Sequence, residues 1–168
     1  MLRFFALFIL IQGLLFGLEL TPWAQHWFVM PWTGTLARTS AGLVKLFDPS
    51  VLAQGNVLQS TRNGFAVSIE AGCNGIEATI VLLAAIIAFP APWKRRLLGV
   101  ALGVAAVQGL NIVRLISLFY LGQWDLRIFE WAHLYVWQAL IMLDVLIVWL
   151  LWVRMLPALS SVSEPARA

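Results

Sequence analysis

Ionisable side chains are scarce in this sequence. Of its 168 residues, 11% are Asp, Glu, Lys or Arg, two are His and one is Cys. A single cysteine excludes an intramolecular disulfide, and no Cys/His spacing is typical of a metal site, so we expect neither a metal nor a cofactor. The composition is 61% hydrophobic, more than a soluble domain of this length would bury. We therefore expect an integral membrane protein that contacts a lipid bilayer and no nucleic acid.

Long hydrophobic runs predict an all-α polytopic membrane protein forming a single membrane domain. The first run is followed by Leu-Glu-Leu-Thr-Pro-Trp, which is a poor cleavage site, so we interpret it as an uncleaved span rather than a signal peptide. About four transmembrane helices are expected, near residues 4–20, 73–89, 97–121 and 133–156. The segments between them are an extracytoplasmic 21–72, a loop 90–96 and an extracytoplasmic 122–132, followed by a disordered tail at 157–168.

Basic residues set the expected orientation. Lys94, Arg95 and Arg96 lie in the short loop between the second and third spans, and such clusters mark the cytoplasmic side. With four spans, Arg3 and Arg154 fall on that side as well. The sequence therefore predicts that both termini are cytoplasmic.

The long extracytoplasmic segment carries two further signals. Residues 36–47 have an apolar face and two basic residues, which predicts a short helix lying in the membrane interface. Asn63 and Gly64 separate two strand-like runs within 57–70, which predicts a β-hairpin with Phe65, Val67 and Ile69 on one face. We expect this hairpin either to help bind a peptide or merely to cap the helices.

Three chemically distinctive residues converge on one leaflet under this topology. Cys73 opens the second span, Arg114 lies near the outer end of the third, and His133 begins the fourth. A cysteine at a helix N-terminus is expected to have a lowered pKa, a histidine can transfer protons, and an arginine can stabilise a thiolate or an oxyanion. The pattern predicts a thiolate nucleophile.

Neighbouring residues are expected to support that site. Gly72 and Gly75 would let the backbone approach a substrate carbonyl closely. Glu77, one turn from Cys73, would form an ion pair with Arg114, and Asn111, one turn from Arg114, would hydrogen-bond across helices.

Each of these residues also has a structural interpretation. A lone cysteine is often a small core residue, and a histidine at the end of a span is often an interfacial one. Asp144 lies too deep to orient His133, so we expect it to pair with another span or to form an interhelical hydrogen bond.

The sequence resembles the exosortase and archaeosortase family. The resemblance rests on Cys-Asn-Gly at the start of one span, Asn-x-x-Arg near the outer end of the next, and a histidine opening the span after that, and it is best over residues 70–137. The chain's size and the phrases Glu-Ala-Gly-Cys-Asn-Gly and Asn-Ile-Val-Arg-Leu-Ile-Ser-Leu-Phe-Tyr-Leu-Gly are most similar to the compact exosortase H subfamily. Asn74, in the supporting set, stands where many relatives carry Ser.

The resemblance implies a cysteine transpeptidase or protease of the bacterial inner membrane, with its site facing the periplasm. By motif its catalytic residues fall on Cys73, Arg114 and His133. Its partners would be proteins bearing a C-terminal signal, formed by a short motif such as IPTLxxWG, a membrane span and a basic tail. Two other hypotheses remain: a non-enzymatic membrane assembly partner, and a small transporter in which Arg114, Glu77 and Asp144 line a path. The substrate, the acceptor nucleophile and the oligomeric state do not follow from the sequence.

Overall fold

The computed structural model describes residues 2–156, so the tail expected at 157–168 lies outside the described residues. The fold is a helical bundle with one small sheet, which confirms the predicted fold class. The elements in order are α1 (Leu2–Glu19), α2 (Pro22–Ala24), the π-helix η1 (Gln25–Val29), α3 (Met30–Val44), β1 (Val51–Gln54), β2 (Val57–Ser60), β3 (Ala66–Ser68), α4 (Ile76–Ala88), α5 (Trp93–Trp124), α6 (Leu126–Trp131), the π-helix η2 (Ala132–Val136) and α7 (Trp137–Arg154).

Within the described residues, three helices are long and apolar enough to cross a membrane: Leu2–Glu19, Trp93–Trp124 and Leu126–Arg154. The second expected span is shorter, because α4 has 13 residues and rises only about 20 Å, against a hydrocarbon core of about 30 Å. This helix begins at Ile76 rather than at 73. Gly75 precedes it with a φ of 71°, a left-handed conformation that cannot continue a right-handed helix.

Small residues let α4 pack closely inside the bundle. Ala78, Leu82 and Ile86 of α4 form a buried cluster with Val107 of α5 and Val145 of α7. A Cβ placed on Gly103 of α5 would lie 2.6 Å from the Leu82 side chain, so that helix pair has no room for one. Close approach of this kind holds helices together in lipid, where burial of apolar surface gives little driving force.

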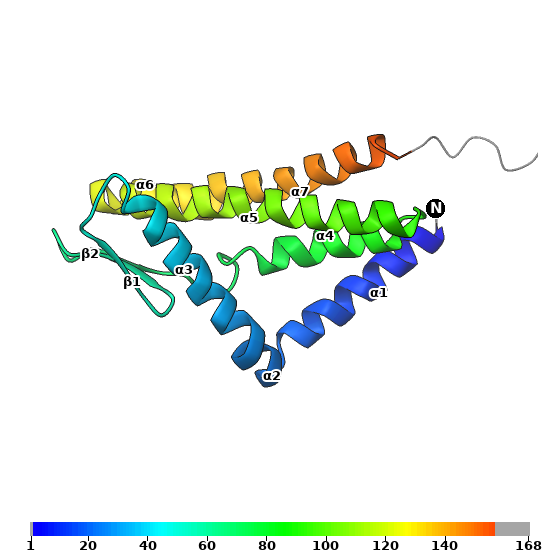
Figure 1. The fold of residues 1–168 in the computed structure, drawn as a ribbon, viewed down its shortest axis with the longest axis horizontal. Coiled ribbons are helices and arrows are strands. Elements are labelled where there is room, and N and C mark those ends of the chain that lie inside the picture. Colours follow the sequence, from blue (N-terminus) through cyan, green and yellow to red (C-terminus); the bar gives the residue numbers. More distant parts are fainter. Residues whose placement is uncertain (1, 157–168) are drawn as a thin grey trace, which may run out of the picture.

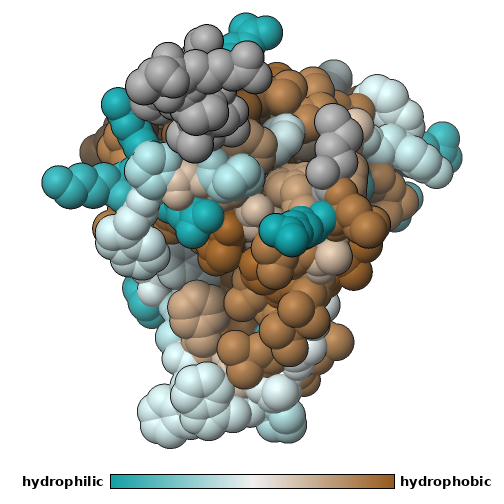
Figure 2. Space-filling model, turned by 90° about the vertical axis from the view of Figure 1, so that its right-hand side faces the viewer, coloured by the Kyte–Doolittle hydropathy of each residue, from teal (hydrophilic) through white to brown (hydrophobic). Residues whose placement is uncertain are grey.

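The two ends of the molecule differ in structure. Figure 1 shows the start of α1, the turn from α4 to α5 and the end of α7 at one end, and the sheet with α6 at the other. Figure 2 looks onto the first end and shows scattered hydrophilic side chains above a largely hydrophobic surface. The basic residues of the α4–α5 turn and the sheet thus lie at opposite ends of the bundle.

The sheet contains the expected hairpin and one strand more. Strands β2 and β3 are antiparallel with Leu58 opposite Val67, and Gly64 in the turn has a φ of 75°. The additional strand β1 pairs with β2, so the order is β1-β2-β3. Val51–Gln54 has four residues and lies between two turns, so its sequence alone does not predict a strand. Its pairing with β2 identifies it as one.

The sheet rests on helices rather than on the bilayer surface. Ile69 is 2% exposed and packs with residues of α3 and α5, and Phe65 and Val67 lie against the same cluster, as their shared face predicted. A helix is present where one was predicted at 36–47, but it begins and ends earlier in the chain. The helix is α3, which ends at Val44 and buries Leu36, Ala37 and Ala41 beneath the sheet.

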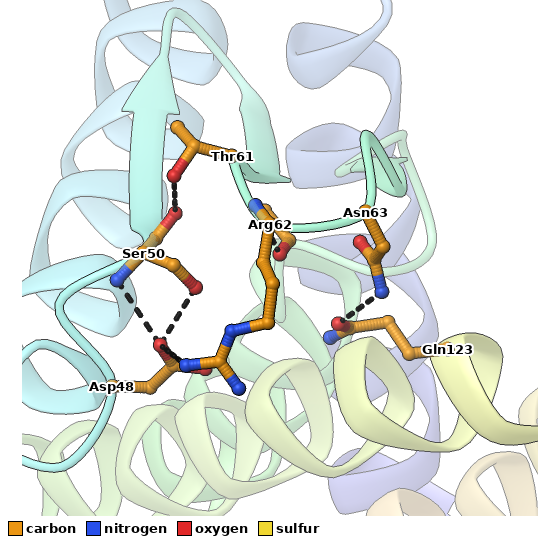
Figure 3. Close-up of polar contacts among 7 residues, drawn as sticks. Asp48, Ser50, Thr61, Arg62, Asn63 and Gln123 are labelled. Atoms are coloured by element: carbon orange, nitrogen blue, oxygen red, sulfur yellow. Dashed lines mark hydrogen bonds and ion pairs between the residues drawn. The ribbon is translucent and has the colours of Figure 1, made fainter.

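Polar contacts fix the hairpin to its neighbours (Figure 3). The Asp48 carboxylate accepts hydrogen bonds from the Ser50 backbone N–H at 3.0 Å and from the Ser50 hydroxyl at 2.6 Å, and it pairs with Arg62 at 3.4 Å. Asn63 donates to the side-chain oxygen of Gln123 at 2.9 Å, which ties the hairpin turn to the end of α5. The loop that follows β3 therefore begins at a sheet whose position these contacts fix.

Candidate active site

The structure brings the three predicted residues into contact. The Cys73 sulfur lies 2.9 Å from Nε2 of His133, and Nη2 of Arg114 donates to the same sulfur at 3.5 Å. The three side chains come from the loop before α4, from η2 and from α5. They are distant in sequence, so the contact depends on the packing of the whole bundle.

The loop that carries Cys73 is a series of turns rather than the first turn of a helix. The Cys73 backbone N–H donates to the Glu70 carbonyl at 3.0 Å, and Gly72 has a φ of 82°. The thiol is half-buried against the cluster beneath the sheet. Cys73 therefore lies three residues before α4, and the expected contact with a helix N-terminus was wrong.

This placement reverses the expected direction of the pKa shift. Burial raises the pKa of the Cys73 thiol, the positive charge of Arg114 opposes that rise, and the carboxylates of Glu77 and Glu70 add to it. The net pKa lies above its ordinary value. At rest the residue is a neutral thiol that needs a base, and His133 is in position to act as one.

Arg114 is buried, and no carboxylate within residues 2–156 forms an ion pair with it. It is 2% exposed, and Nη1 donates to the Gly72 carbonyl at 3.3 Å while Nη2 contacts Cys73. An unpaired buried guanidinium is costly unless a negative charge forms beside it. A thiolate or an oxyanion at Cys73 would supply that charge.

The expected ion pair between Glu77 and Arg114 was wrong. Among the described residues the ion pair within 4.0 Å joins Arg62 to Asp48. Glu77 accepts instead from the Gly72 backbone N–H, while Arg114 donates to the Gly72 carbonyl. Glu77 binds the backbone N–H of Gly72 and Arg114 binds its carbonyl, so both side chains fix the loop next to Cys73.

His133 is positioned by an irregular turn of helix. It lies in η2, the π-helical segment that joins α6 to α7, and its ring stacks on Phe129 with centroids 5.7 Å apart. A π-helical turn rotates the following residues relative to a regular helix and is common at functional sites. In this protein the π-helical turn places Nε2 of His133 next to the Cys73 thiol.

Asn74 anchors the loop to α3. It is 1% exposed, its side-chain oxygen accepts from the Ile76 N–H at 3.0 Å, and its amide donates to the Thr33 hydroxyl at 3.4 Å. The Asn74 carbonyl accepts from the indole N–H of Trp32 at 3.3 Å. Sequence analysis missed Trp32 and Thr33, because a contact over some 40 residues leaves no local pattern.

Gly75 serves close packing rather than access to a substrate. A Cβ there would lie 2.9 Å from the side-chain amide of Gln108 and 3.0 Å from that of Asn111. Gln108 donates to the Gly75 carbonyl at 3.1 Å. Gln108 was also missed, although its helical spacing from Asn111 and Arg114 places all three on one face of α5.

Two polar residues expected to pair within the bundle do not. Asn111 is fully buried, and neither atom of its amide group has a hydrogen-bond partner in residues 2–156. Oδ2 of Asp144 is likewise buried without a partner in that range. The interhelical bonds predicted for them are absent from the described chain.

A helical bundle with apolar spans and a thiol, imidazole and guanidinium in mutual contact defines a multi-pass membrane protein with a cysteine-centred site. The chain matches the family model for transmembrane exosortases (Exosortase_EpsH) over residues 2–153. It therefore belongs to the transmembrane exosortase family, as the sequence resemblance indicated. No curated protein and no solved structure shows a significant match to it.

Proposed function

We propose that this protein is a membrane cysteine transpeptidase or protease whose nucleophile is Cys73. The observation that carries the proposal is the contact of one sulfur with both a proton acceptor, Nε2 of His133 at 2.9 Å, and a fixed positive charge, Nη2 of Arg114 at 3.5 Å. Membership of the exosortase family supports it. Nucleophile, base and electrostatic stabiliser are the groups that acyl transfer requires.

The chemistry follows from the positions of these groups. His133 takes the thiol proton as the Cys73 sulfur attacks a backbone carbonyl carbon, and Arg114 stabilises the resulting oxyanion. The tetrahedral intermediate collapses as the C–N bond breaks, and the leaving amine takes the proton from His133, which leaves a thioester on Cys73. Water or an amine then gives its proton to His133 and attacks the thioester. The thiol regains that proton and the product is released.

The substrate class proposed is a protein with a C-terminal signal made of a short motif, a membrane span and a basic tail. The similarity of residues 70–137 to compact exosortase H supports a motif of the IPTLxxWG type. The Cys73 loop lies before the start of α4, at the opposite end of this helix from the basic residues at the start of α5 (Figure 1). By the positive-inside rule that end faces the periplasm from the inner membrane.

The test is co-expression with a model signal protein, meaning a tagged protein that ends in an IPTLxxWG motif, an apolar span and a basic tail. We expect the wild-type chain to truncate the signal protein and Cys73→Ala to abolish truncation while inserting normally into membranes. The matched control is Ala71→Ser, a small change at an exposed neighbour of the site. Release of the truncated signal protein as its C-terminal hydroxamate when hydroxylamine is added would identify a thioester on Cys73 as the intermediate.

Undiminished truncation by Cys73→Ala would overturn the enzyme hypothesis in favour of an assembly partner. A transporter would depend on Asp144 more than on Cys73. The contacts of Arg114 and Glu77 with Gly72 favour the enzyme over the transporter, because both charges hold a loop rather than line a path.

A further inference from the structure

An apolar groove runs along the membrane-facing side of α4. It has a volume of about 520 Å³ and is bounded by α1, the α2–η1 elbow, α4 and α5. Leu18 and Leu83 lie on its walls, and Trp23 and Phe28 at its mouth are 65% and 58% exposed. Figure 1 shows that the elbow at α2 lies away from the other helices, which leaves this side of α4 less covered. The volume is within the range of about 300–1,000 Å³ typical of binding pockets.

Three polar residues, Glu19, Thr79 and Gln108, line this otherwise apolar groove. Gln108 is 8% exposed, and its side-chain oxygen has no hydrogen-bond partner within residues 2–156 although its nitrogen donates to Gly75 and Thr79. Glu19, the last residue of α1, lines the same space. A buried acceptor without a donor is costly, so a ligand that brings an N–H would be favoured. A lipid acyl chain brings none.

The groove lies next to the Cys73 loop, because Ile76, the first residue of α4 after that loop, lines it. Gln108 lies six residues before Arg114 on α5, about 9 Å deeper, and it holds the Gly75 carbonyl two residues after Cys73. Between Val100 and Gln108 the α5 wall extends about 12 Å along the helix. A polypeptide that leaves Cys73 toward the membrane interior would therefore enter this groove.

We propose that the groove binds the first turns of the substrate's own transmembrane helix. This inference rests on the proposed function, since that function requires a peptide bond at Cys73 to be followed closely by a span. The first four N–H groups of a helix have no partner within the helix, and its N-terminus carries partial positive charge. The Gln108 oxygen can accept one of those N–H groups, and the Glu19 carboxylate faces the positive end of the dipole. The apolar walls then cover the side chains that follow.

Site-specific photocrosslinking tests the proposal. A photoreactive phenylalanine replaces Leu18 on the groove wall or, as the matched control, Leu146 on α7. These two leucines are 51% and 49% exposed, and only Leu18 lines the groove. Each probe is placed in the Cys73→Ala background, so that bound signal protein is not turned over. We expect crosslinks to the span of the model signal protein from position 18 and none from position 146.

Equal crosslinking from both positions, or lipid adducts alone at position 18, would overturn the groove proposal. Processing of the signal protein by the wild-type chain is measured in parallel. Processing without a crosslink at position 18 refutes the groove and leaves the enzyme intact. A crosslink at position 18 without processing by the wild-type chain refutes the enzyme and leaves the groove as a binding site.

A charge variant provides an independent measurement. Glu19→Leu should raise the signal-protein concentration needed for half-maximal processing about fivefold, because it removes the negative charge beside the substrate helix dipole. Glu130→Gln, an exposed acid on α6, serves as the control. Thermal unfolding of Glu19→Leu in detergent should match that of the wild type, so that a change in half-maximal concentration is not attributed to loss of the fold. An unchanged half-maximal concentration in Glu19→Leu would contradict the proposal.

Discussion

At the scale of single residues, the thiol is subject to opposing influences. Burial and the carboxylates of Glu77 and Glu70 raise the pKa of Cys73, and the guanidinium of Arg114 lowers it. The neutral thiol therefore dominates at rest, and under the proposed function His133 accepts its proton when a substrate is attacked. This arrangement limits unwanted reactions of a thiol that is only half-buried.

The pH dependence of Cys73 alkylation measures these influences. Because its pKa is raised, the rate of reaction with iodoacetamide should still be rising at a pH above the ordinary pKa of a free thiol. Glu77→Gln removes a charge that raises the pKa, so its curve should shift to lower pH. Arg114→Gln removes the charge that lowers it and should shift the curve to higher pH. Glu130→Gln should superimpose on the wild type, and shifts opposite in sign would contradict this electrostatic account.

Residue types and spacing were enough to predict which side chains meet at the site. Cys73, Arg114 and His133 could be grouped because each lies near the same end of a span, and the structure brings them into contact. The partners of Glu77 could not be predicted, because the choice between Arg114 and the Gly72 N–H depends on the left-handed turn at Gly72. The backbone conformation of Gly72 therefore determines which group the Glu77 carboxylate contacts.

At the scale of elements, the sheet presents a free edge beside the site. The order β1-β2-β3 leaves the outer side of β3 without a strand partner in the described chain, and β3 ends five residues before Cys73. The Phe65 carbonyl accepts from the Ser60 N–H of β2, and the Ile69 N–H donates to the carbonyl of Asn56, just before β2. By the alternation of the ladder, Ala66 and Ser68 therefore turn their N–H groups outward. An extended peptide could pair with this edge and bring its carbonyl to the thiol.

We expect Ala66→Pro to reduce processing of the model signal protein severalfold, since it removes an outward N–H while sparing the bonds between β2 and β3. Ala66→Val keeps the N–H and should process at the wild-type rate. Thermal unfolding in detergent should be similar for both variants. Full processing by a folded Ala66→Pro chain would mean that the sheet only caps the bundle, the alternative interpretation of the hairpin.

Local patterns also limited what could be predicted about the elements. The Asn63–Gly64 turn and the alternation of Phe65, Val67 and Ile69 were sufficient for the hairpin, because both signals lie within a few residues. Strand β1 and the packing of α3 beneath the sheet could not be predicted, because both depend on contacts with other segments that local sequence patterns do not specify. The π-helical turn at His133 likewise has no sequence signature.

At the scale of the whole molecule, the orientation in the membrane can be measured directly. In the Cys73→Ala background, Arg62→Cys at the sheet end and Lys94→Cys in the first turn of α5 place one exposed thiol at each end of the bundle. Arg62→Cys should react with a membrane-impermeant maleimide in spheroplasts, and Lys94→Cys only after permeabilisation. The reverse pattern would place the site in the cytoplasm.

The order in which the chain is made bears on the histidine of the last long helical segment. Synthesis and insertion proceed from the N-terminus, so Cys73 and Arg114 reach the membrane before His133 does. Until η2 docks, the thiol lacks its contact with Nε2 of His133. Under the proposed function, a nascent chain therefore has no general base beside Cys73 until the last long helical segment is in place.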